Sequence, residues 1–213
     1  MKIIFLDIDG VLNGYNKWNI FGYKIADKLN IKKYYKKIID PFGVHKSKVK
    51  RLAKIVRKTG AKVVLSSSWR YRYWKYANSM TVNKNEYDPS KWSNNEYDND
   101  IEKLYWLFKK FNIDVIDITE RYSGERCRRD IEIQSWLNEY ESSKYYMTQE
   151  EYDPITNYII LDDENMILLN YHGDERFIQT SSIYIGQDIV GLGVEDTGLK
   201  RKHVKLAIQI LNR

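Results

Sequence analysis

Cysteine, proline and long apolar runs are scarce in this sequence, and their scarcity excludes several classes of protein. The single cysteine, Cys127, cannot form a disulfide within the chain, so a disulfide-stabilised secreted domain is excluded. No apolar run approaches the roughly 20 residues that span a bilayer. The apolar run from Ile3 to Leu6 meets Asp7 at once, so it is too short for a secretory signal. We therefore expect a cytoplasmic protein.

Two nucleotide-binding motifs are also missing. The segment Gly-x-x-x-x-Gly-Lys-Ser/Thr does not occur, which excludes a P-loop kinase within these 213 residues. Gly191-Leu192-Gly193 lacks the third glycine and the preceding strand of a dinucleotide-binding turn. The three histidines stand apart, without metal-ligand spacing. The chemistry of this chain is therefore expected from other residue types.

Positive charge is concentrated near the N-terminus. Residues 15–58 contain fourteen Lys or Arg and two acids, a local balance of +12 in a chain of net charge +6. We predict a basic, partly helical, cap-like insert at residues 14–59, after the first strand of a single domain that spans residues 1–213. A basic segment beside an acidic body favours an anionic partner, with nucleic acid the leading candidate. A lysine-rich helix surface that only faces water is the alternative.

Hydrophobic periodicity predicts an α/β fold. Mostly apolar segments predict strands at residues 2–6, 62–65, 113–118, 158–161 and 177–178, and the first of them is continuous from Ile3 to Leu6. Apolar residues at helical spacing predict helices at 47–59, from 70 onward, at 101–111, at 129–140 and at 204–211. The polar stretch 78–100 is interpreted as a long surface loop. This alternation predicts a Rossmann-like parallel sheet with helices on both faces.

Reactive side chains follow three of the predicted strands. They are Asp7 and Asp9 after the first strand, Ser66, Ser67 and Ser68 after the second, and Asp162 and Asp163 after the fourth. In a parallel sheet the carboxyl ends of the strands meet at one edge, where ligands bind. Asp7 and Asp9 point the same way on an extended chain, and Gly10 lets the backbone approach a ligand. With Arg129 at a helix start, this edge is a predicted site for Mg²⁺ and a phosphate.

In this order along the chain, the segments resemble the four motifs of the haloacid dehalogenase (HAD) superfamily of phosphohydrolases. Residues 7–13, Asp-Ile-Asp-Gly-Val-Leu-Asn, are similar to the first motif, and the serines, an arginine and the acidic pair are similar to the other three. A closer resemblance is to the HAD phosphatase domains of bacterial and phage RNA-repair proteins. It is carried by residues 65–70, 129–137, 160–163, 177–180 and 197–199.

The resemblance implies catalytic roles for several residues. Asp7 would attack phosphorus and form an aspartyl-phosphate, and Asp9 would act as general acid and base. Ser67 or Ser66 would hydrogen-bond the phosphoryl group, and the register with Trp69 favours Ser67. The third motif is usually Lys, but an Arg can serve. Three arginines are candidates, and the register with Trp136 favours the last of them: Arg126, Arg128 and Arg129.

The resemblance also implies binding roles. Mg²⁺ would be held by Asp7, Asp162 and Asp163, together with the backbone carbonyl of Asp9. Further contacts to the phosphate or substrate are assigned to Gly10, Ser68, Arg70 and Arg128. The role of residues 180–197 is left open, because this stretch is longer than in the related domains.

The implied activity is hydrolysis of phosphomonoesters, and the basic segment inclines the prediction toward nucleic-acid ends, RNA or DNA, with a 3′-phosphate. A nucleotidase or small-molecule phosphatase is one alternative, and a non-catalytic HAD-like binding module is another. The aromatic residues near the motifs either stack on nucleobases or pack in the core. They are Tyr71, Tyr73, Trp74 and Tyr76 after the serines, and Trp18, Phe21 and Tyr23 after the first motif.

Overall fold

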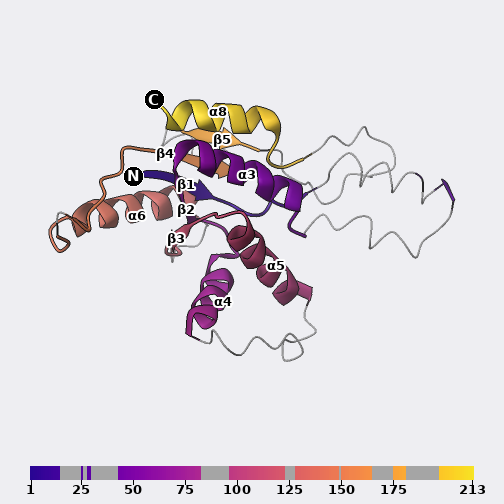
Figure 1. Ribbon diagram of the computed structural model, residues 1–213, viewed down its shortest axis with the longest axis horizontal. Coiled ribbons are helices and arrows are strands. Elements are labelled where there is room, and N and C mark those ends of the chain that lie inside the picture. Colours follow the sequence, from indigo (N-terminus) through magenta and orange to yellow (C-terminus); the bar gives the residue numbers. More distant parts are fainter. Residues whose placement is uncertain are drawn as a thin grey trace.

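Five short apolar segments form one parallel sheet in the computed structural model, which describes residues 1–14, 25, 28–29, 43–82, 96–122, 128–148, 150–164, 175–180 and 197–213. The strands lie in the order β3-β2-β1-β4-β5 (Figure 1). Their bounds are Lys2–Leu6 for β1, Lys62–Leu65 for β2, Val115–Ile118 for β3, Asn157–Asp162 for β4 and Phe177–Gln179 for β5. β1 is central. The chain adds β2 and β3 on one side of β1 before it adds β4 and β5 on the other side.

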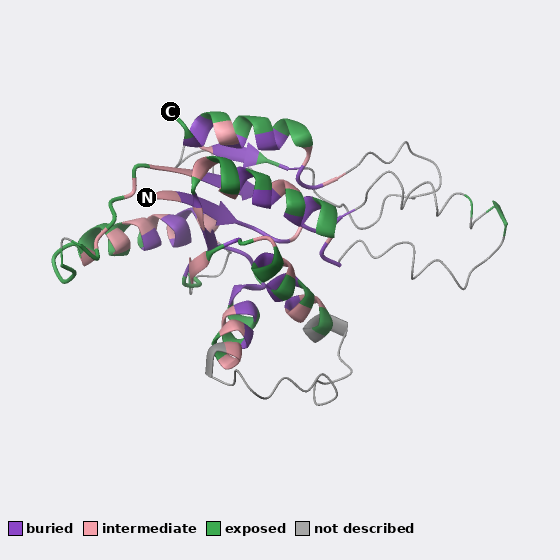
Figure 2. Ribbon diagram, in the orientation of Figure 1, coloured by how far each residue is buried: buried purple, intermediate pink, exposed green. Residues whose placement is uncertain are grey.

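Five described helices cover the sheet. Their bounds are Lys46–Thr59 for α3, Arg70–Val82 for α4, Glu96–Lys110 for α5, Arg129–Ser143 for α6 and Arg201–Leu211 for α8. Alternate residues of β1 enter different cores, as strand geometry requires. Ile4 and Leu6 pack in the core that includes α3, α5 and α8, whereas Ile3 and Phe5 pack against α6. Buried residues of α3, α6 and α8 pack against the sheet, whereas α4 packs mainly on α5 (Figure 2). The predicted parallel sheet with helices on both faces is confirmed.

The predicted loop at residues 78–100 is too long. α4 continues to Val82 and α5 begins at Glu96, so helices enter the stretch from both ends. Ala77 and Met80 pack against the larger core, and this burial stabilises the last turns of α4 in a polar sequence. Tertiary packing here outweighs the composition on which the loop prediction rested.

The last part of the predicted 14–59 insert contributes to the main core. Val49, Leu52 and Ile55 of α3 are fully buried against the sheet, as their helical spacing requires. Residues 15–24 and 30–42 lie outside the described residues, so the extent of the insert and the single-domain span 1–213 stay predictions. None of the described helices combines the length and the apolar character needed to cross a membrane.

Gly198 and Gly60 offer a matched pair of tests for backbone packing. Both have positive φ, 74° and 69°, which costs an L-residue about 1 kcal/mol. A Cβ on Gly60 would meet nothing within 4 Å, whereas one on Gly198 would lie 2.8 Å from the carbonyl oxygen of Val11 and 2.9 Å from that of Asn13. Gly60→Ala is expected to lower the free energy of unfolding by about 1 kcal/mol, and Gly198→Ala by about 3 kcal/mol because overpacking is added. Urea unfolding of both variants measures this, and equal losses would contradict the packing of residues 197–199 on the loop after β1.

Candidate active site

The residues directly after β1, β2 and β3 continue the backbone hydrogen bonding between neighbouring strands by one residue. The Asp7 N–H donates to the Leu161 carbonyl (2.9 Å), the Ser66 N–H to that of Leu6 (3.0 Å), and the Thr119 N–H to that of Leu65 (2.9 Å). Asp162 ends β4 next to these residues, since Leu161 is the register partner of Leu6. The polar side chains predicted at three strand ends therefore do meet at one edge. β1 and β4 lie where the chain order reverses, which is where open α/β sheets bind ligands.

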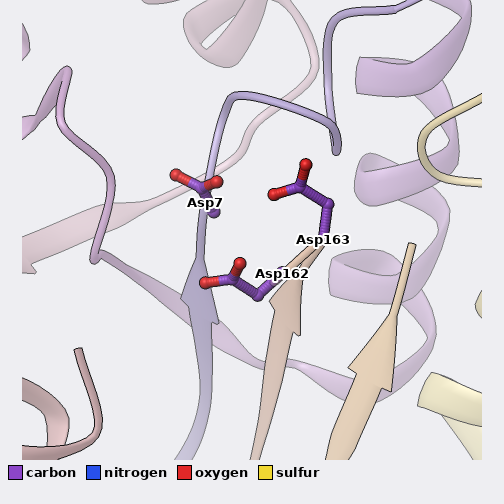
Figure 3. Close-up of side chains that lie close together, drawn as sticks. All are labelled: Asp7, Asp162 and Asp163. Carbon is purple, nitrogen blue, oxygen red and sulfur yellow. The ribbon is translucent and has the colours of Figure 1, made fainter. Parts of the chain in front are cut away.

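Three carboxylates converge at the ends of β1 and β4. Asp7, Asp162 and Asp163 each place one oxygen within 4.8 Å of the other two (Figure 3). Asp7 and Asp162 are buried, and Asp7 Oδ1 has no hydrogen-bond partner within the described ranges of the chain. Hard oxygen ligands of this kind suit Mg²⁺, and a buried carboxylate oxygen without a donor needs a compensating charge. The residues present therefore fit a divalent cation.

The pKa shifts of these groups have identifiable causes. Burial has the largest effect on Asp7 and raises its pKa well above the usual value; the charge of Arg129 opposes this, Asp162 and Asp9 raise it further, and hydrogen bonding by the Ser67 hydroxyl lowers it. Burial, followed by the charge of Asp162, raises the pKa of Asp163 to about 6. A bound cation would favour the ionised form of both carboxyl groups.

Arg129, the first residue of α6, supplies positive charge to this cluster. Its Nη1 lies 2.5 Å from Asp162 Oδ2 and 3.4 Å from Asp7 Oδ2. Arg128 points elsewhere and donates to both oxygens of the buried Asp130, at 3.0 and 2.8 Å. Arg126 lies outside the described residues. Of the two described arginines that were candidates for the third motif, Arg129 is the one next to Asp7.

The Asp9 carboxylate is held by donors that the sequence analysis did not assign. Asn13 Nδ2 donates to Oδ1 (2.7 Å), and Trp69 Nε1 donates to Oδ2 (3.0 Å). Ser68 Oγ donates to the same Oδ2 at 3.3 Å. Leu12 N–H donates to the Ile8 carbonyl (2.9 Å), and this tight turn brings Asn13 back over Asp9. Asn13 and Trp69 both lie within the motif segments, but the turn after β1 is needed to place Asn13 on Asp9, and the serine segment after β2 is needed to place Trp69 there.

The loop after β1 is fixed by contacts from three distant elements. Lys48 of α3 is fully buried and donates to the Asn13 carbonyl (2.6 Å). Thr180, after β5, donates to the Gly10 carbonyl (2.7 Å), and the Leu199 N–H donates to the Val11 carbonyl (2.9 Å). Gly10 has a φ of 63°, and a Cβ there would overlap the Asp163 carboxylate. The position of Asp9 therefore depends on the last two described segments of the chain.

The three serines have different surroundings. Ser67 is buried, its Oγ accepts from the Trp69 N–H (3.3 Å), and its hydroxyl lies near enough to Asp7 to lower the pKa of that carboxyl group. Ser66 is fully buried, and its Oγ has no partner among the residues that the structure describes. Ser68 is exposed and contacts Asp9, as noted above. The contact with Asp7 favours Ser67 over Ser66 as the second-motif residue.

Arg70 is buried away from the surface on which a substrate would lie. Its Nη2 pairs with Glu132 of α6 (3.1 Å), and its Nη1 donates to the carbonyls of Ser66 and Ser67, both at 3.2 Å. These contacts link the serine segment to α6, which also carries Arg129. The geometry favours a role for Arg70 in holding the serines over the predicted direct contact with phosphate.

The aromatic residues after the serines divide between core and surface. Tyr73 and Tyr76 are buried against Tyr105 of α5, so for these two core packing is the correct interpretation. Tyr71 is 48% exposed, and Trp74 is partly buried. Trp18, Phe21 and Tyr23 lie outside the described residues.

A five-stranded parallel sheet with a buried aspartate and two further carboxylates where the strand order reverses is consistent with a HAD-like α/β fold. Residues 3–88 match the family model described as the HAD domain in Swiss Army Knife RNA repair proteins. Over these residues the chain is similar to a HAD domain of the RNA-repair type, which supports the predicted resemblance. The match includes Asp7, Asp9 and the serines, and it ends before Arg129 and the acidic pair. The searches of curated proteins and of solved structures gave no match.

Proposed function

We propose that this protein is a Mg²⁺-dependent phosphomonoester hydrolase that acts on nucleic-acid ends through a phosphoryl-enzyme intermediate on Asp7. The observation that carries the proposal is the contact of Arg129 with Asp7 inside the cluster of three carboxylates. With these roles, a nucleophilic oxygen, a guanidinium and a set of metal ligands would act together on one phosphoryl group. This supports the proposal, because catalysis of phosphoryl transfer is mainly positioning and charge stabilisation.

The chain's own residues would carry out two successive displacements. An Asp7 oxygen bonds to phosphorus as the bond to the leaving oxygen breaks, and Asp9 donates a proton to that oxygen. Asp9 then accepts a proton from water, whose oxygen attacks phosphorus and releases Asp7 and inorganic phosphate. Arg129 and the Ser67 hydroxyl stabilise the negative charge on the phosphoryl oxygens. Trp69 and Asn13 hold Asp9 in the orientation that both proton transfers require.

Asp7, Asp162 and Asp163 would hold the Mg²⁺ ion, with the Asp9 carbonyl as a further ligand. The bound ion would offset the repulsion between the Asp7 carboxylate and the substrate phosphate. The buried Asp7 Oδ1, which has no donor among the described residues, supports this assignment.

The match to RNA-repair domains supports a nucleic-acid end as the substrate, and we propose a 3′-phosphate. The test compares Mg²⁺-dependent phosphate release from 3′- and 5′-phosphorylated RNA and DNA oligonucleotides, mononucleotides and a generic aryl phosphate. We expect the 3′-phosphorylated oligonucleotide to have the highest kcat/KM, and its KM to rise with salt, because binding to the phosphate backbone is salt-dependent. Preference for mononucleotides without salt dependence would indicate a nucleotidase. No turnover of any substrate, with intact binding, would indicate a non-catalytic module.

Trp69→Phe isolates the hydrogen bond to Asp9, because it keeps most of the buried aromatic volume and removes the indole N–H. We expect kcat to fall roughly tenfold with KM nearly unchanged, since misplacing a catalytic group affects the transition state more than binding. Trp136→Phe is the matched control, because Trp136 Nε1 donates to Asp117 at 2.7 Å, away from Asp9. Steady-state kinetics over a range of pH measures both. Equal kcat and an unchanged pH profile in Trp69→Phe would remove Trp69 from this role.

A further inference from the structure

α3 and α8 together present a basic surface that extends from the active site. The two helices pack side by side over the same face of the sheet (Figure 1). Neither helix contains an Asp or a Glu. Five basic residues of α3 and three of α8 are exposed, and six of these eight recur at intervals of four residues along their helix. We call these six residues the basic α3–α8 face: Lys46, Lys50, Lys54, Lys58, Arg201 and Lys205.

The spacing of these side chains makes ordered rows. On α3 they recur every four residues, and Arg201 and Lys205 of α8 have the same separation. Residues four apart lie above one another on a helix, about 6 Å apart along its axis. α3 therefore carries a row of positive charge about 20 Å long. Evenly spaced cations of this kind suit a polymer with evenly spaced phosphates.

The amino ends of both helices lie next to the loop that carries Asp9. The His45 N–H, just before α3, donates to the Leu12 carbonyl (2.9 Å), and the Leu199 N–H, just before α8, donates to the Val11 carbonyl (2.9 Å). The rows therefore begin beside the catalytic loop and run away from it along the sheet. If the end of a nucleic-acid strand reached Asp7, we expect its phosphate backbone to pass near Lys46 and Arg201, the first residues of the two helices.

The positive charge is unfavourable for the fold itself. Like charges four residues apart destabilise a helix, and cations in the first turn oppose the helix dipole. No acidic residue occupies the first turn of either helix. Burial, with the charges of Lys202, Lys200 and Arg51, lowers the pKa of His203 of α8 to about 4, consistent with a positive potential over this surface. An anionic partner would offset these costs.

Two basic residues of α3 are instead structural. Lys48 is buried on the Asn13 carbonyl, and Arg51 Nη1 donates to the Leu199 carbonyl (2.6 Å). They fix the loops that separate the face from the active site. The basic residues of α3 are thus divided between packing and an open surface, and α8 extends that surface from a segment far along the chain.

We propose that the basic α3–α8 face binds the phosphate backbone of the nucleic acid whose end enters the active site. The inference rests on the proposed function and identifies the surface that would hold its substrate. An anionic membrane is a poorer fit, because the apolar sides of both helices are buried in the core apart from Leu206, and interfacial helices insert a whole apolar side into lipid.

The test is binding of RNA to the whole chain and to two triple variants of equal charge. Lys50→Gln, Lys54→Gln and Lys205→Gln alter the face; Lys75→Gln, Lys103→Gln and Lys110→Gln alter exposed lysines of α4 and α5 and serve as the control. The probe is a labelled, unphosphorylated RNA of about ten nucleotides, longer than the face at about 3.4 Å per nucleotide. Fluorescence anisotropy over a range of salt gives Kd and its slope. Aryl phosphate turnover and thermal unfolding are measured in parallel.

We expect the face variant to bind RNA roughly tenfold to a hundredfold more weakly, with a salt slope lower by about 2, while the control binds as the original chain does. Both variants should keep their aryl phosphate turnover, and the face variant should unfold at an equal or higher temperature. Equal RNA binding by the two variants would overturn the proposal. So would a face variant that loses binding only to vesicles of phosphatidylglycerol and phosphatidylcholine. If RNA binding depends on the basic α3–α8 face but no substrate is turned over, the proposed hydrolase activity would be refuted, while the proposed RNA-binding surface would be supported.

Discussion

Asp7→Asn is expected to lower turnover of every phosphorylated substrate by more than about 10⁴-fold, the scale on which loss of a nucleophile acts. The amide keeps the shape of the side chain but cannot form the acyl phosphate. The loss should appear equally with the aryl phosphate and with the oligonucleotide, because both share the step at phosphorus. Phosphate release in the presence of Mg²⁺ measures it.

The same substitution should not unfold the protein. The pKa of Asp7 is raised in the folded state, so the ionised carboxylate lowers the free energy of unfolding at pH values above that pKa. This loss becomes smaller as the pH falls from the folded-state pKa toward the ordinary pKa of the group. Asp7→Asn should therefore unfold at an equal or higher temperature at pH 7 without Mg²⁺, and the gain should shrink toward acid pH. A variant that keeps its turnover would refute the nucleophile, and one that unfolds at lower temperature would contradict the electrostatics of the site.

Arg129→Gln is expected to reduce kcat by about 10² to 10³, as loss of one positioned donor to a transition-state oxyanion does. The substitution also leaves three carboxylates together without their guanidinium. Breaking a buried ion pair costs about 3 kcal/mol, and we expect a loss of this order in the absence of Mg²⁺. Added Mg²⁺ should restore much of the stability, because a ligand that binds only the folded state stabilises it.

Arg128→Gln is the control for that experiment. It removes the neighbouring arginine, whose partner is Asp130, and should leave kcat within a few-fold of the original. Thermal unfolding with and without Mg²⁺, beside kinetics on the aryl phosphate, separates the two variants. A larger loss of kcat in Arg128→Gln would transfer the third-motif role to Arg128.

The sheet and its reactive edge were predictable because local sequence determines them. Each strand is mostly apolar, and the candidate aspartates and serines lie at or just after the ends of three of the strands. A parallel sheet then brings strand ends together whatever the order of the strands. This reasoning needs no knowledge of side-chain contacts, and it located Asp7, Asp162 and Asp163 correctly at a single edge.

The supports of Asp9 were not predictable in this way. Trp69 and Asn13 reach its carboxylate only because a tight turn and the serine segment place them there. Lys48 looked like one of many lysines in a basic run, yet it is buried on the Asn13 carbonyl. Arg70 was assigned to phosphate or substrate binding from the resemblance, and the structure pairs it with Glu132. Such contacts join segments far apart in sequence, which periodicity does not encode.

The central claim is that the phosphoryl group passes through Asp7, and trapping that intermediate tests it most directly. The protein is mixed with substrate labelled in the transferred phosphoryl group and quenched in acid within one turnover, and its peptides are separated. The account predicts label on the peptide that contains Asp7, released by hydroxylamine as acyl phosphates are, and absent from Asp7→Asn. Phosphate release without enzyme-bound label, or hydroxylamine-resistant label on the peptide that contains Ser67, would contradict it.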